Sequence, residues 1–279
     1  MHLLDSKPLK QAGFTLIELS IVLVIIGLIV GGVLVGQDLI KAAEIRATVG
    51  QVEKYNAAVN TFRTKYNGIP GDLVYTQASA FGLVLPAAGI TSGGGTGLGD
   101  GNGLIQDTAS ANAPIGEPLI FWQHLSTASL IDGSLGTNIT SGAVIATSGT
   151  VSQYLPSAKL GRGNYWVVGS DTGTNYYILG GVTSISSTAY TYSLALTPIE
   201  SYNIDVKLDD GAPDTGIVQA RTNHVSAFGS LSGTYGSTIA PTTGCIVAGA
   251  AGVTDPSSTY NRGTTSGTTP NCMLRFRFN

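Results

Sequence analysis

The chain has little charge and few of the residues on which most enzymes and metal sites depend. Only 11% of its 279 residues are charged, less than half of the roughly 25% usual in soluble domains, whereas Gly, Ser and Thr are abundant. No G-x-S-x-G elbow, P-loop, H-E-x-x-H or G-x-G-x-x-G pattern occurs. These absences predict a protein that is not an enzyme and whose neutral, polar surface suits an extracellular location.

Histidine and basic residues are also scarce. The three histidines, His2, His124 and His224, have no zinc-ligand spacing with the cysteines, and His124 is expected to pack or lie at the surface of a helix. From residue 67 onward seven basic residues stand against twelve acidic ones, a balance of −5, which opposes nucleic-acid binding. Arg275 and Arg277 are a local exception, and we predict that they lie on the solvated face of a strand.

The only two cysteines lie near the C-terminus, at Cys245 and Cys272. A disulfide between them would stabilise the fold by about 3 to 4 kcal/mol on the chain-entropy model. Two buried free thiols are the alternative. An envelope or extracellular location would favour the bridge.

One long apolar run is present near the N-terminus. From Phe14 to Gly36 only Thr15, Glu18 and Ser20 are appreciably polar, and a helix of about 23 residues can cross a hydrocarbon core of about 30 Å. No small-residue A-x-A pattern follows, so the run differs from a cleaved secretory signal peptide. We therefore predict a retained transmembrane helix.

The short segment before the apolar run sets the predicted orientation. Residues 1–13 carry Lys7 and Lys10, and the positive-inside rule keeps such a segment in the cytoplasm. The prediction is a single span over residues 14–36, with the N-terminus inside and the rest of the chain outside.

Glu18 is the informative residue of the span. A carboxylate in an apolar helix costs about 2.5 to 3.5 kcal/mol on insertion and ordinarily needs a partner, yet no basic residue occurs between Phe14 and Gln37. A free α-amino group, created by cleavage beside Phe14 on a neighbouring copy, would serve. The alternative is a glutamate near the helix end that snorkels to the lipid headgroups.

The residues Gly13 to Leu19, Gly-Phe-Thr-Leu-Ile-Glu-Leu, and the apolar run after them resemble the prepilin leader of type IV pilins and type II secretion pseudopilins. The resemblance implies cleavage after Gly13 by a prepilin peptidase, N-methylation of Phe14, and neutralisation of a neighbour's N-terminus by Glu18. It covers the first tenth of the chain closely. Beyond it, the resemblance is to general architecture and to scattered segments such as Asn67–Asp72 and Phe121–Leu125, which are similar to segments of some large pilin-like proteins.

An amphipathic helix continues after the span. Its apolar residues recur at helical spacing, Asn67-Gly68 is a C-cap signal, and Pro70 opposes continuation, so one helix of about 80 Å is predicted over residues 14–66. Its second apolar stripe must pack under a globular head, residues 67–279. The apolar positions are Ile45, Val49, Val52, Tyr55, Val59, Phe62 and Tyr66.

The head is predicted to be mostly β, which makes the whole an α+β, pilin-like fold with an antiparallel sheet laid across the long helix. Helices are expected at residues 118–131 and from Thr197, where Thr197 and Glu200 form a capping box. The Gly, Ser and Thr-rich stretches 91–103, 133–152 and 229–269 are expected to be largely irregular. Strands are expected at residues 165–169, 176–182, 190–196, 216–220 and 273–278.

Calcium is a weak possibility and no other cofactor is expected. Asp100, Asn102 and Asp107, or the set Asp209, Asp210 and Asp214, place hard oxygen ligands in Gly-containing loops, and some pseudopilins bind calcium in their heads. Neither loop matches an EF-hand. Asx-turns explain these residues better than a metal site does.

The predicted function is that of a structural subunit of a type IV pilus or pilus-like filament. Its partners would be further copies and related pilins in a helical filament, the prepilin peptidase and an inner-membrane assembly platform. It would begin in the bacterial inner membrane and end in an extracellular filament. The alternatives are a pseudopilin of a periplasmic pseudopilus and, from a different class, an uncleaved membrane-anchored binding module.

Overall fold

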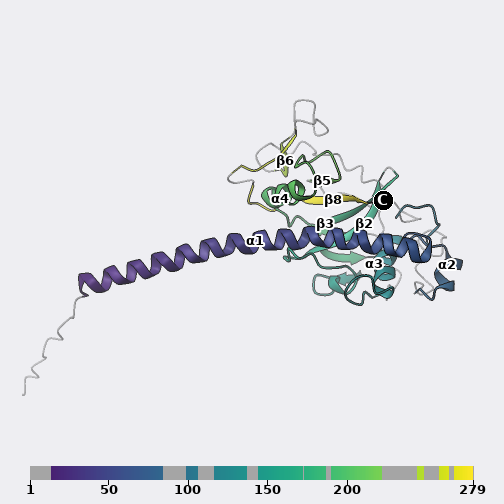
Figure 1. The fold of residues 1–279 in the computed structure, drawn as a ribbon, viewed down its shortest axis with the longest axis horizontal. Helices are drawn as coiled ribbons and strands as arrows, with labels where there is room; N and C mark the ends of the chain where they lie inside the picture. Colours follow the sequence, from purple (N-terminus) through teal and green to yellow (C-terminus); the bar gives the residue numbers. More distant parts are fainter. Residues whose placement is uncertain are drawn as a thin grey trace, which may run out of the picture. The chain divides into compact units, whose positions relative to one another are not determined.

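A computed structural model describes residues 14–83, 99–105, 116–136, 144–171, 173–186, 190–221, 244–247, 258–263 and 267–278. The fold is α+β and pilin-like, with a long N-terminal helix whose later part packs on an antiparallel sheet (Figure 1). The chain divides into two compact units between Ala43 and Glu44. The first unit contains the apolar start of the helix, and the second contains the rest of the helix and the head.

The long helix α1, Leu16–Tyr66, ends where the sequence predicts. Asn67 follows it with φ +52°, a left-handed conformation that asparagine tolerates, and its amide bonds to the carbonyl of Arg63 at 2.8 Å. Pro70 comes three residues later and cannot continue the helix. The prediction of one long helix is confirmed over residues 16–66.

Within the second unit, the predicted apolar face of α1 is buried. Tyr55 is central to this packing: its ring meets Trp122 edge-on at 4.9 Å and Trp166 at 5.7 Å between centroids. These contacts join α1 to a helix and to the sheet of the head. Of the seven predicted apolar positions only Val49 is half-buried, and the others are buried.

The six-stranded sheet is organised around β3, Thr174–Ser186. All of its pairings are antiparallel: its first half lies between β2, Asn164–Asp171, and β8, Met273–Phe278, and its second half between β1, Val144–Thr147, and β4, Tyr190–Ser193. β5, Val218–Arg221, pairs with the outer side of β8. A separate pair is formed by β6, Ile246–Val247, and β7, Thr259–Tyr260.

Four predicted strands are confirmed, and β8 has the predicted bounds. The run expected at 190–196 is shorter than predicted, because Leu196 leaves β3 and forms a single bridge with Cys272. The strand β1 was not predicted and lies in a stretch expected to be irregular. The short helices α2, Tyr75–Ala80, and η1, Val151–Gln153, were not predicted either. Each is too short to carry a periodic sequence signal.

Helix α3, Glu117–Thr127, ends earlier than the predicted residue 131. Ser129 has φ +57°, and the amide of Leu130 bonds back to the carbonyl of Leu125 at 2.9 Å. This pattern closes the helix in the manner of a Schellman motif. The apolar residues after Thr127 therefore belong to the turn.

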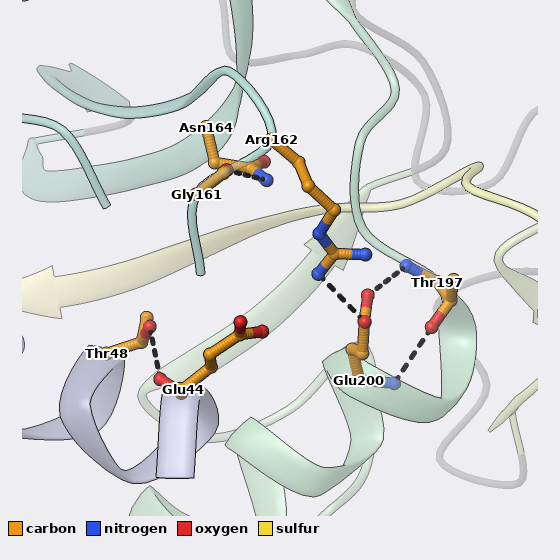
Figure 2. A network of polar contacts seen from close by, with 7 residues as sticks. All are labelled: Glu44, Thr48, Gly161, Arg162, Asn164, Thr197 and Glu200. Atoms are coloured by element: carbon orange, nitrogen blue, oxygen red, sulfur yellow. Dashed lines mark hydrogen bonds and ion pairs between the residues drawn. The ribbon is translucent and has the colours of Figure 1, made fainter. Parts of the chain in front are cut away.

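Helix α4, Pro198–Leu208, begins with the predicted capping box. The Glu200 amide donates to Thr197 Oγ1 and the Thr197 amide donates to Glu200 Oε2. Figure 2 shows that Glu200 also receives the guanidinium of Arg162, with Nη2 and Oε1 2.8 Å apart. The cap thus ties α4 to the turn before β2. On α1, the hydroxyl of Thr48 bonds to the carbonyl of Glu44.

The prediction for Arg275 is wrong. Its neighbour Arg277 is exposed, but Arg275 is only 2% exposed. Its guanidinium forms an ion pair with Asp171 at 2.8 Å, donates to Gln219 Oε1 at 2.7 Å and lies over the Tyr176 ring. A buried arginine is tolerated because a carboxylate and an amide satisfy its donors. Three other strands supply these partners, so the alternation along β8 gave no sign of them.

The predicted disulfide between Cys245 and Cys272 is present, with the Cα atoms 5.1 Å apart and both residues fully buried. It joins the segment that enters β6 to the start of β8.

Replacing both cysteines with serine is expected to lower the free energy of unfolding by about 3 to 4 kcal/mol on the chain-entropy model. Chemical denaturation of the full chain in detergent would measure the change. A wild-type protein under reducing conditions is the control, and it should show a similar loss. A loss below about 1 kcal/mol in both would contradict a stabilising bridge.

Candidate functional site

The candidate site is the N-terminal part of α1, and its first turn carries a capping box that the sequence analysis did not identify. The Glu18 amide donates to Thr15 Oγ1 at 3.3 Å, and both the amide and the hydroxyl of Thr15 donate to Glu18 Oε2 at 2.8 Å. The T-x-x-E spacing of this capping box is present in the sequence, where it overlaps the start of the apolar run. Thr15 and Glu18 therefore fix the point at which the helix begins.

This capping arrangement uses only one oxygen of Glu18. Oε2 accepts both bonds from Thr15, whereas within the described residues no hydrogen bond or ion pair reaches Oε1. The first turn of a helix also favours a negative charge, because the backbone amides point toward it. The carboxylate can thus cap its own helix and still accept a cationic group from another molecule.

Phe14, the predicted first residue of the mature protein, directly precedes this cap and is 85% exposed. Gly13, the predicted residue before the cleavage site, lies outside the described residues. Cleavage and methylation at this junction stay predictions.

The apolar part of α1 has no covering in the first unit. Large apolar side chains from Leu16 to Ile40 are each at least half exposed, and α1 is long and apolar enough to cross a membrane by length and composition. Gly27, Gly31, Gly32 and Gly36 have no other group within 4 Å of the place where a Cβ would lie. Lipid or further helices can therefore approach the backbone closely at these positions.

Gln51 anchors the other part of α1 to the head. Its Nε2 donates to the Ser157 carbonyl at 3.0 Å, and its Oε1 accepts from the Lys159 amide at 2.8 Å and from Trp166 Nε1 at 3.2 Å. One amide side chain thus satisfies polar groups of β2 and of the turn before it. No sequence pattern marked Gln51, because these three partners in the head lie more than 100 residues away.

The calcium candidates of the first loop lie in a cluster that the sequence did not predict. Asp100 lies beside Asp72 and Glu117, and ligand oxygens of the three lie within 4.8 Å of one another. The amide of Asn102 bonds to Asp100 Oδ1, which is the predicted Asx-turn, and the amides of Gly101 and Gly103 bond to Asp72. Asp107 lies outside the described residues.

The second set of calcium candidates also lies beside a carboxylate that the sequence did not predict as a ligand. Asp209 and Asp210 lie beside Asp205, again with oxygens within 4.8 Å, and Asp210 Oδ1 accepts from the Ala212 amide in an Asx-turn. Asp209 accepts from the amides of Ile217 and Val218. Both sets bring three carboxylates within reach of one ion, but these carboxylates also accept hydrogen bonds from their own loops, and calcium binding stays a prediction.

A family model described as the prokaryotic N-terminal methylation motif matches residues 8–34. No curated protein and no solved structure matches the chain. The match covers the predicted cleavage site, Phe14, Glu18 and most of the apolar run. The chain is therefore prepilin-like, with a methylation motif joined to a pilin-like α+β fold.

Proposed function

We propose that the chain is a structural subunit of a type IV pilus or pilus-like filament, inserted into the inner membrane as a prepilin and polymerised through α1. One observation carries the proposal: an uncovered apolar helix with a single carboxylate near its start, inside the methylation motif. Residues 1–13 would be the leader, residues 14–66 the helix and residues 67–279 the head. The prepilin peptidase and an inner-membrane assembly platform are the partners that such a subunit requires.

Burial of the apolar part of α1 supplies the cohesion. Outside the membrane its exposed side chains would face water, and burying one of them fully is worth about 1.5 to 3 kcal/mol. More than a dozen lie between Leu16 and Ile40, so α1 is stable outside lipid only when other helices cover it. Further copies of the same helix, or those of related pilins, fit this need.

Glu18 would set the register between copies. Once Gly13 is removed, Phe14 carries a positively charged, N-methylated amine. Oε1 of a neighbour's Glu18 can then accept a hydrogen bond from this amine, while Oε2 keeps its capping bonds with Thr15. A copy out of register would leave one of the two charges unpaired among apolar side chains. The pairing therefore favours one axial position.

The mature N-terminus tests this proposal directly. Mass spectrometry of protein sheared from the surface of producing cells is expected to find a chain that begins at Phe14 and carries one additional methyl group. Membrane fractions of the same cells, in which processing is incomplete, provide the comparison. An intact Met1 in the membrane, with no protein in the sheared fraction, would instead support an uncleaved anchored binding module.

A periplasmic pseudopilus is the alternative within the same class, because its subunits use the same N-terminal processing. The head with its Cys245–Cys272 disulfide and neutral polar loops favours a surface-exposed pilin. Processed protein that remains in the periplasm and never reaches the sheared fraction would identify the pseudopilus instead. Nucleic acid is not among the proposed partners, since the head is acidic.

A further inference from the structure

Two segments of the head, Asn67–Asp72 and Phe121–Leu125, contact each other at His124. This residue is 0% exposed on α3 and its Nδ1 accepts a hydrogen bond from the Gly71 amide at 3.0 Å. Its ring also stacks on Phe62 of α1, with 5.8 Å between centroids and 10° between planes. His124 thus touches the C-terminal part of α1 and the turn that follows it.

The hydrogen bond determines the protonation state of His124. Because Gly71 donates to Nδ1, Nδ1 carries no proton, and the imidazole is neutral with its proton on Nε2. Nε2 is buried and makes no hydrogen bond in the described part of the chain. A second proton could enter only at Nδ1, directly opposite the Gly71 N–H.

Gly71 allows the turn to approach α3 this closely. It has φ +88°, and a Cβ there would lie 2.6 Å from the Glu117 carbonyl oxygen. The next residue, Asp72, holds a loop through the amides of Gly101 and Gly103 at 2.8 and 2.7 Å. The turn therefore links α1, α3 and residues 99–105, and His124 is its hydrogen-bond anchor on α3.

We propose that His124 is an acid-sensitive latch, which holds the turn Ile69–Leu73 on α3 while the imidazole is neutral and releases it when the imidazole becomes protonated. Protonation replaces an acceptor with a donor that faces the Gly71 N–H, and it places a cation in the core. The release would loosen the attachment of the C-terminal end of α1 to the head.

No charged group on the surrounding elements is paired with His124 in the described part of the chain. They are Arg63 and Lys65 on α1, Asp72 in the turn, Asp100 in the loop and Glu117 on α3. None of them forms a hydrogen bond or ion pair with His124 in the described structure, and Asp72 is already committed to two backbone amides. Two of the five groups are cationic and oppose protonation, whereas the three carboxylates favour it, and burial is the cause that lowers the pKa of His124.

The direction of the pH dependence follows from burial. Burial lowers the pKa of His124 from 6.5 to about 4, so between these values the opened state binds more protons than the closed one. The latch is therefore fully stable above about pH 6.5 and weakens as the pH falls toward 4. At pH 5.5 opening should be favoured roughly tenfold relative to pH 7.5.

Amide hydrogen exchange of the full chain in detergent micelles tests the latch, after correction for intrinsic exchange rates. Protection of residues 67–74 and 117–127 is expected to fall roughly tenfold between pH 7.5 and pH 5.5, while β2 and β3 stay protected. The matched variant is His124→Asn, because an asparagine Oδ1 can take the place of Nδ1 and accept from Gly71 without titrating. Its protection at these peptides should be the same at both pH values.

Two results would overturn the latch. One is unchanged protection of these peptides in the wild type down to pH 5. The other is an equal loss of protection in His124→Asn, which would assign the effect to other groups such as Asp72. If this variant does not fold, the imidazole pKa measured by NMR in the wild-type chain decides, since titration of His124 near 6.5 would contradict a ring held neutral by the fold.

Discussion

Glu18→Ala is expected to insert into the membrane and to be processed normally, yet to reduce the yield of surface filaments at least tenfold. The proposed cleavage and methylation would act at Gly13 and Phe14, which the substitution leaves in place. Assembly differs, because each neighbouring Phe14 amine would be buried without a carboxylate. Leaving one member of a buried ion pair unpaired costs about 3 to 5 kcal/mol, which is a large penalty for every subunit added.

The proposed pairing role of Glu18 must be separated from its capping role, because Glu18 also caps its own helix through Thr15. Loss of an N-terminal cap costs only about 0.5 to 2 kcal/mol. Glu18→Gln keeps an oxygen that can accept from Thr15 but has no charge, so it should assemble nearly as poorly as Glu18→Ala. Filament recovery after shearing, normalised to the processed protein in membranes, measures both variants.

Glu53→Ala is the matched control, since Glu53 is an exposed glutamate on the part of the same helix that packs on the head. It should leave the filament yield unchanged. If Glu18→Gln restores normal yield while Glu18→Ala does not, capping and not charge pairing is the function of Glu18. Normal yield in both variants would refute the register role altogether.

The second large effect concerns Asp205, whose substitution by asparagine is expected to stabilise the head above pH 7. Asp205 is 0% exposed, its Oδ2 accepts from the Tyr260 hydroxyl at 2.7 Å, and its Oδ1 accepts from the Gly211 amide at 3.2 Å. Burial, assisted by the nearby charges of Asp210 and Asp209, raises its pKa to about 7. The folded head therefore binds a proton that the unfolded chain releases above about pH 4.

The sign of this effect is opposite to that of His124. Stability from protonated Asp205 is fully present below about pH 4 and is lost as the pH rises through about 7. At about 1.4 kcal/mol per pKa unit the loss would reach about 4 kcal/mol, and screening around exposed Asp210 reduces it to about 2 to 3 kcal/mol. His124 loses stability by a comparable amount as the pH falls from 6.5 to 4.

The free energy of unfolding of the wild-type head should therefore change little between pH 4 and 6.5. In each variant, the pH dependence caused by the remaining group should become visible. Asp205→Asn is expected to lose stability as the pH falls through this range, and His124→Asn is expected to lose it as the pH rises. Denaturant unfolding at pH 4.5, 6.0 and 8.0 measures the three proteins. Parallel pH profiles in all three would show that neither group governs the stability of the head.

A control for Asp205 is available on the same helix. Lys207→Gln changes an exposed charge near the end of α4 and should shift stability by no more than about 0.5 kcal/mol at any of these pH values. Tyr260→Phe removes the hydroxyl that bonds to Asp205 and should destabilise the head most at pH 8, where the carboxylate is ionised. An equal effect of Tyr260→Phe at pH 4.5 would contradict ionisation of Asp205 between these values.

Several features of the site and fold followed from local patterns. The extent of α1, its buried stripe, the capping box of α4 and the alternation that places Leu274 and Phe276 in the core all rest on residues a few positions apart. The methylation motif and Glu18 are equally local. The capping box of Thr15 and Glu18 was readable by the same rule and was overlooked.

The sequence by itself determined the long apolar helix, the methylation motif and the positions of most strands, because the spacing of apolar residues and the composition of turns act over short distances. Only the tertiary structure decided which polar groups are buried together. Arg275 lies with Asp171, His124 with Gly71, and Asp205 with Tyr260. Each pair joins segments more than 50 residues apart, and no periodicity encodes such a contact, since its energy exists only after the chain has packed.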